Sequence, residues 1–139
     1  MADRTDRIPI IRLRDTLIVS VQVDLTDQLV HQLSDDLTRE IGATGARGLI
    51  IDVSGVALLD SYISRAVRDM GLVAHFMGVR AVICGLAPAV AMTLIEMGMD
   101  LKGVHGELNL GEAVDWLRRV TAEEDRRGRA ARPAPRRAR

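Results

Sequence analysis

The stretch Gly48-Leu-Ile-Ile-Asp-Val53 decides the fold. A short, continuous apolar run that follows a glycine-rich turn is typical of a strand buried on both faces of a parallel sheet. The loop Ser54 to Leu59 comes next, and the pair Asp60-Ser61 stands before a helical pattern that runs from Tyr62 to Met77 and closes at Gly78. Functional groups in open α/β sheets gather outside the carboxyl ends of strands, so this loop is the first candidate for a site.

The residues before this strand predict a hairpin and a helix. The segments Ile8–Leu13 and Thr16–Val23 are rich in β-branched residues and are separated by a polar tip, which indicates two strands. Aliphatic residues then recur at every fourth position and form one apolar stripe of a helix, at positions 25, 29, 33, 37 and 41. Either Asp24 or Thr26 would cap the start of this helix, and Gly42 would end it.

The residues after residue 78 continue the alternation of strands and helices. They predict a strand Arg80–Gly85, a helix Ala87–Met97, an edge strand Val104–Leu108 and a last helix Gly111–Val120 that is capped by Asn109. The order β-β-α-β-α-β-α-β-α predicts an α/β fold with a mixed β-sheet of about five strands and about four helices. Its parallel crossovers are expected to be right-handed.

Length and composition indicate one domain in a reducing compartment. The chain has 139 residues, of which 47% are hydrophobic and 27% charged, and this suits a single globular core. Cys84 is the only cysteine, which excludes an intramolecular disulfide. The first 11 residues carry charges and no apolar centre of a signal peptide, and no apolar run approaches the ~20 residues of a membrane helix. We therefore expect a cytoplasmic protein.

Charge is distributed unevenly along the chain. Residues 121–139 hold seven arginines and three acidic residues, a net charge of +4, whereas residues 1–120 hold 12 basic and 16 acidic residues, a net charge of −4. The C-terminal stretch has no apolar period, so we expect a domain over 1–120 followed by a disordered arginine-rich tail over 121–139. Such a tail could touch nucleic acid or acidic proteins, but the lack of aromatic residues favours a solvated end and makes nucleic acid an unlikely partner.

The hydroxyl of Ser61 has two interpretations. The simpler one is a helix cap whose oxygen accepts a backbone N–H, a contribution of ~1 kcal/mol. The other is phosphorylation by a protein kinase, because the free N–H groups and the dipole of a helix N-terminus both favour negative charge. Phosphorylation would add about −1.5 to −2 charges beside Asp60, and a partner docked there against an apolar or acidic patch would be repelled.

The run Ile51-Asp-Val-Ser-Gly-Val-Ala-Leu-Leu-Asp-Ser-Tyr-Ile63 resembles the signature of the STAS domain, the fold of anti-sigma-factor antagonists. Within that family it is most similar to the RsbS-type scaffolds of the bacterial stressosome. Three further stretches agree in the same order, namely residues 8–13, 16–22 and 88–98. The resemblance covers about residues 8–120.

The resemblance implies a scaffold without enzymatic activity that takes part in signal transduction in a stress response. In such proteins the serine that matches Ser61 is phosphorylated by an RsbT-type serine kinase and dephosphorylated by a PP2C-like phosphatase, while RsbR-type STAS paralogues join the scaffold in a large assembly that sequesters the kinase. The neighbours Leu59, Asp60, Tyr62 and Ile63 would then contact partners. Simple antagonists follow the Asp-Ser pair with a small residue and glycine, so Tyr62 and Ile63 favour the scaffold.

Other chemistries find little support in the sequence. The surroundings of Ser61 do not form a G-x-S-x-G elbow, and His31, His75 and His105 lie on separate elements without metal-ligand spacing. No phosphate-loop motif follows a strand, so no cofactor or metal is expected. Cys84 lies in an apolar strand and is expected to be a buried core residue. Two alternatives stay open: a soluble antagonist that binds an anti-sigma factor directly, and a ligand-binding STAS-like module.

Overall fold

The computed structural model describes residues 7–21, 26–56, 61–96 and 104–132, and they form five strands and four helices. The elements are, in chain order, β1 (Ile10–Leu13), β2 (Thr16–Ser20), α1 (Asp27–Thr44), β3 (Gly48–Asp52), α2 (Ser61–Phe76), β4 (Arg80–Cys84), α3 (Pro88–Glu96), β5 (Val104–Glu107) and α4 (Leu110–Ala131). This order confirms the predicted one.

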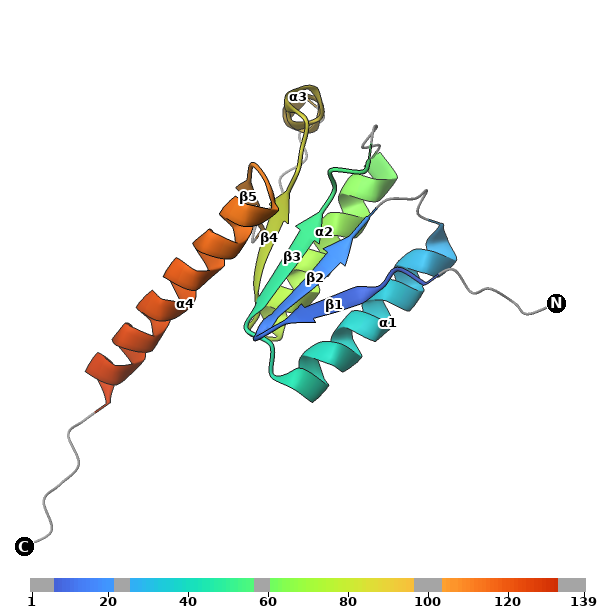
Figure 1. The fold of residues 1–139 in the computed structure, drawn as a ribbon. Helices are drawn as coiled ribbons and strands as arrows, with labels where there is room; N and C mark the ends of the chain where they lie inside the picture. Colours follow the sequence, from blue (N-terminus) through green and yellow to red (C-terminus); the bar gives the residue numbers. More distant parts are fainter. Residues whose placement is uncertain (1–6, 22–25, 57–60, 97–103, 133–139) are drawn as a thin grey trace, which may run out of the picture.

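The strands form one sheet in the order β1-β2-β3-β4-β5 (Figure 1). The β1–β2 hairpin is antiparallel, and every other neighbouring pair is parallel, as the predicted mixed sheet requires. Ile18 pairs with Ile50, and Ile50 pairs with Val82, so side chains at these positions share one face. The parallel strands β2, β3 and β4 therefore end at the same edge of the sheet, which we call the carboxyl edge.

Helices cover the two faces of the sheet unequally. The face that carries Leu17, Leu49 and Ile83 packs with α1 and α2 into the larger core cluster. The opposite face carries Ile50 and Val82 and packs against α4, mainly through the buried side chains of Ala113 and Leu117. Each strand in the centre of the sheet is therefore buried on both faces, as the apolar runs in the sequence predict.

The two ends of α1 show which residue caps its start and correct the predicted position of its end. Thr26 is the N-cap, because its side chain accepts a hydrogen bond of 3.2 Å from the amide of Leu29. The helix passes through Gly42, where we expected it to end, and stops at Gly45. Gly45 adopts a left-handed φ of 64°, and its N–H bonds the carbonyl of Ile41, which is the common glycine cap.

The last helix begins as predicted but is much longer. Asn109 caps α4 by accepting a hydrogen bond of 2.9 Å from the amide of Glu112. The helix then continues to Ala131, so the predicted end at Val120 is wrong, and so is the prediction of disorder for residues 121–131. Residues 133–139, the rest of the predicted tail, lie outside the described residues.

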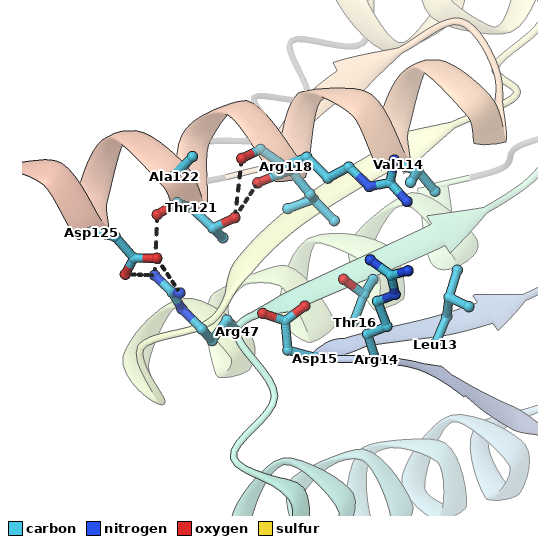
Figure 2. Close-up of a pocket in the computed structure, with 11 residues that line it drawn as sticks. Leu13, Arg14, Asp15, Thr16, Arg47, Val114, Arg118, Thr121, Ala122 and Asp125 are labelled. Atoms are coloured by element: carbon cyan, nitrogen blue, oxygen red, sulfur yellow. Dashed lines mark hydrogen bonds and ion pairs between the residues drawn. The ribbon is translucent and has the colours of Figure 1, made fainter.

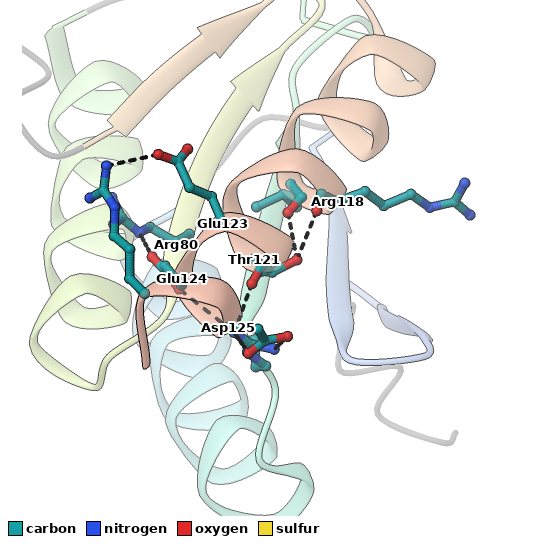
Figure 3. Close-up of polar contacts among 9 residues, drawn as sticks. Arg80, Arg118, Thr121, Glu123, Glu124 and Asp125 are labelled. Carbon is teal, nitrogen blue, oxygen red and sulfur yellow. Dashed lines mark hydrogen bonds and ion pairs between the residues drawn. The ribbon is translucent and has the colours of Figure 1, made fainter. Parts of the chain in front are cut away.

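Ion pairs hold the part of α4 beyond residue 120 against the start of β3 and β4. The Arg80 side chain, at the start of β4, donates to Glu124 over 2.6 Å (Figure 3). Arg47, just before β3, pairs with Asp125 over 3.0 Å (Figure 2). The hydrogen bond that Arg47 donates to the carboxylate of Asp125 also raises the pKa of Arg47, against the opposing effect of burial. These contacts join residues 44 and 78 positions apart in the sequence, and a local pattern does not reveal them.

Candidate functional site at the carboxyl edge

The predicted site loop starts at the carboxyl end of β3. Ser54 donates its backbone N–H to the carboxylate of Asp52 over 2.9 Å, and the amide of Val56 bonds the carbonyl of Val53 over 3.0 Å. These bonds turn the chain away from the sheet directly after the strand ends. The following residues, 57–60, lie outside the described residues, and the chain is described again where α2 begins at Ser61.

The structure refines the position of Ser61. Because α2 begins at Ser61, this serine is the first residue of the helix and not the capping residue before it, as one interpretation of the sequence expected. The first-turn N–H groups of a helix have no partner within the helix, which makes this end of α2 suitable for negative charge. The side chain of Ser61 and the predicted contact residues Leu59 and Asp60 lie outside the described part of the chain.

The two other predicted contact residues differ in exposure. Tyr62 is 39% exposed, and its hydroxyl donates a hydrogen bond to the carboxylate of Asp27 in the first turn of α1. Ile63 is buried in the larger core cluster. Tyr62 therefore links the N-termini of α1 and α2 at the surface, whereas Ile63 anchors the start of α2 to the sheet below it.

The structure adds Arg65 and Ser64 to the residues near Ser61. Arg65 is exposed and follows Ser61 by four residues in α2, a spacing that places two side chains on the same side of a helix. Ser64 is fully buried, and its hydroxyl has no hydrogen-bond partner. The i,i+4 spacing of Ser61 and Arg65 could have been read from the sequence, but the burial of Ser64 could not.

Helix α3 brings an apolar surface to the same edge. The helix begins at Pro88, one residue after the predicted start at Ala87, and it follows the carboxyl end of β4, the strand next to β3 (Figure 1). Met92 is 63% exposed and Ile95 77% exposed. Exposed apolar side chains that are grouped on one short helix are suited to contact a partner protein.

A close backbone approach joins the ends of β3 and β4. Gly85 has a φ of 81°, and a Cβ added there would lie 2.8 Å from the backbone nitrogen of Ser54. Only glycine fits this turn without displacement, which explains a glycine directly after β4. Beside it, burial raises the pKa of the Cys84 thiol to about 12, with a further contribution from the carboxylate of Asp52. Cys84 is thus an unreactive core residue, as predicted.

The described residues hold no group of three or more histidine, cysteine or acidic side chains that could bind a metal ion. His75 and His105 lie on different elements, α2 and β5, and His105 stacks on Trp116 with ring centroids 4.0 Å apart. Within the same ranges, no helix combines the length and the apolar character needed to span a membrane.

A family model described as the STAS domain matches residues 5–125. This chain belongs to the STAS domain family. The match covers both the Ser61 segment and α4 up to Asp125, including the ion pairs with the start of β3 and β4. The resemblance stated from the sequence, to STAS antagonists of anti-sigma factors, is confirmed.

Two solved structures resemble this chain over more than four-fifths of its length. A serine-to-glutamate variant of RsbS from Moorella thermoacetica is 34% identical to this chain, with a TM-score of 0.73, and the match covers 83% of this chain and 97% of that one. A chain in a structure described as "Molecular architecture of the stressosome, a signal integration and transduction hub" is 35% identical with the same TM-score of 0.73, over 81% of this chain and 98% of that one.

Among characterised proteins, the RsbT co-antagonist protein RsbRB of Bacillus subtilis (strain 168) is 22% identical over 109 residues. The match covers 78% of this chain but 39% of RsbRB, so this STAS chain spans about two-fifths of the length of that relative. The RsbS structures, in contrast, are matched over nearly their whole length.

Proposed function

We propose that this STAS protein is a non-enzymatic stressosome scaffold of the RsbS type, which sequesters an RsbT-type serine kinase and is switched by phosphorylation of Ser61. The observation that carries the proposal is the match to RsbS over 97% of that chain, since a chain that contains nearly all of RsbS in the same fold is the simplest candidate for the same role. RsbR-type paralogues would join it in the assembly, and a PP2C-like phosphatase would reverse the switch. Such a protein would work in the cytoplasm.

The carboxyl edge supports a switch of this kind. A phosphate on Ser61 would sit at the N-terminus of α2, where free N–H groups and the helix dipole favour an anion. The exposed Arg65, one turn further along, would offer a cation to the same phosphate. The fold would therefore tolerate the modification, and its effect would fall on whatever is docked at this edge.

The same edge offers a surface for the kinase. Tyr62 presents an amphipathic ring close to Ser61, and α3 presents Met92 and Ile95. A partner that covers these apolar side chains would also bury the region of Ser61, and about −1.5 to −2 added charges would then have to be desolvated on binding. Phosphorylation would release the partner for this reason.

The test is phosphorylation by an RsbT-type kinase with ATP, followed by mass spectrometry of the intact protein. We expect the addition of one phosphate, its loss in Ser61→Ala and its retention in Ser64→Ala. Ser64 is a matched control because it is the same residue type in the same helix turn but is fully buried. A phosphate that is still added to Ser61→Ala would refute the switch.

Size-exclusion chromatography with an RsbR-type paralogue tests the scaffold. A scaffold should elute with the paralogue as a particle far larger than a dimer, and Ser61→Glu should weaken the retention of the kinase by that particle. A soluble antagonist would instead bind an anti-sigma factor and form no large particle with the paralogue. A ligand-binding STAS-like module would retain a small molecule in native mass spectrometry, and either result would replace the proposed function.

A further inference from the structure

Within the described ranges, the helices leave one half of a sheet face uncovered. Helix α4 packs on β3, β4 and β5, but the neighbouring strands β1 and β2 carry apolar residues on the same face. The register pairs Ile11 with Ile18, and Ile18 with Ile50 beneath α4, which places all three on that face. Ile11 is 55% exposed and Leu13, two residues further on, is 47% exposed.

A groove runs between the tip of the β1–β2 hairpin and α4 (Figure 2). It has a volume of about 370 Å³. Leu13 and Thr16 line it from the hairpin, and Val114 and Leu117 line it from α4. With the exposed Ile11 beside it, this groove forms one surface, which we call the hairpin groove.

Two arginines in the hairpin groove form no ion pair within the part of the chain that the structure describes. Arg14 is at the hairpin tip, Arg118 is on α4, and both side chains extend along the groove in Figure 2. Neither side chain has an ion pair or hydrogen bond with another described residue, whereas Arg47 at the end of the groove is neutralised by Asp125. Asp15 also lines the groove and attracts Arg47, so the lining holds three arginines and two aspartates, a net charge of +1. Arg14 and Arg118 lie on the two sides of the apolar floor.

We propose that the hairpin groove binds an acidic amphipathic helix of a partner protein, with apolar side chains on Ile11, Leu13 and Val114 and carboxylates against Arg14 and Arg118. Sheets that are largely parallel are normally covered by helices on both faces, and here one helix position is vacant beside α4. A helix is about 10–12 Å wide with its side chains, and two strands together span roughly 10 Å. The vacant face thus has the width of one helix.

Charge selects the kind of helix. A carboxylate gains a charge-assisted hydrogen bond from each unpaired guanidinium, whereas a basic helix would meet like charges. A second copy of this chain fits less well, because a two-fold contact would place one positively charged groove against another. The occupant is therefore a different protein.

The hairpin groove and the Ser61 surface are at opposite ends of the sheet. Thr16 at the start of β2 pairs with Gly48 at the start of β3, so the hairpin tip lies at the amino ends of these strands. Ser61 follows the carboxyl end of β3. A partner in the groove could stay bound while the Ser61 surface exchanges its own partner, and the two proposals can fail independently.

The test uses a helical peptide of about 18 residues, with leucines spaced three and four residues apart and glutamates and alanines elsewhere. We expect saturable binding in fluorescence anisotropy, and methyl NMR shifts at Ile11, Leu13 and Ile18 but not at Ile95. The double variant Arg14→Glu, Arg118→Glu should bind roughly tenfold more weakly and should prefer an analogue in which lysine replaces glutamate.

The double variant Arg119→Glu, Arg129→Glu is the matched control. Both arginines are exposed on α4 and outside the groove lining, so this variant should bind the acidic peptide like the unchanged protein. The reversed preference for lysine in the first variant also shows that it is folded. The proposal would be overturned if both double variants bound the acidic peptide equally weakly, or if the methyl NMR shifts appeared at Ile95 in place of Ile11. Self-association of the protein through the groove, measured by sedimentation velocity, would also overturn it.

Discussion

The substitution Leu117→Ala tests how α4 is attached to the sheet. Leu117 is 3% exposed and packs with Ile50 and Val82, and a Cβ added to Gly48 would lie only 2.9 Å from its Cδ1. Its methyl groups thus lie directly on the backbone of β3, which cannot move in to fill a cavity. We expect a loss of about 3 kcal/mol, within the roughly 2–5 kcal/mol seen for buried leucines. For a domain that is stable by about 5–15 kcal/mol this is a large fraction.

Urea unfolding followed by the fluorescence of Trp116 measures this loss. Trp116 is the only tryptophan, lies on α4 and stacks on His105 of β5, so its emission reports on helix and sheet together. With a slope of roughly 2 kcal/mol per molar, the midpoint should fall by about 1.5 M urea. Leu110→Ala, at a side chain 40% exposed on the same helix, should lower it by less than about 0.5 M. Equal losses in the two variants would refute anchoring through Leu117.

Three further outcomes follow from the same contacts. Arg47→Ala should cost less than about 1 kcal/mol in urea unfolding, far less than Leu117→Ala, because its ion pairs are partly exposed, and added salt should shrink the loss. Native Cys84 should resist alkylation at pH 8. The pKa of Cys84 is raised to about 12 in the folded protein, so its contribution to the free energy of unfolding is complete below the unfolded pKa of about 8.5. Above that pH, the free energy of unfolding should decline by about 1.4 kcal/mol per pH unit, and Cys84→Ala should remove this slope. Gly85→Ala should lower the melting temperature more than Gly45→Ala, because both have a positive φ but only Gly85 also faces close backbone atoms.

Much of the fold could be predicted because its signals are local. The apolar run of β3, the side-chain oxygen of Thr26 before α1 and that of Asn109 before α4 each act on residues within one turn or one strand. The end of α1 is the exception among local signals. Gly42 and Gly45 both qualify as stops, and the choice depends on which of them adopts a left-handed φ.

Only part of the candidate site can be predicted from the sequence. The position of Ser61 after β3 follows from the order of strands and helices, since consecutive parallel strands share one carboxyl edge. The link from Tyr62 to Asp27 and the burial of Ser64 depend on how α1 and α2 pack on each other. No periodicity in either helix alone contains that information.

The sequence by itself determined the identity and order of the strands and helices, the place of Ser61 at a helix start and the family to which the resemblance points, because periodicity, caps and short motifs are written in neighbouring residues. Tertiary structure decided how α4 is held against the sheet beyond Val120, and it alone decided the open face over the β1–β2 hairpin. Residues 121–131 have no apolar period, but Arg47 before β3 and Arg80 in β4 hold Glu124 and Asp125. The i,i+4 pair of Glu123 and Arg127 supports the helix locally. The hairpin groove exists because α4 covers only three strands of a five-stranded sheet. An uncovered sheet face has no local sequence signal, since it depends on how distant elements pack.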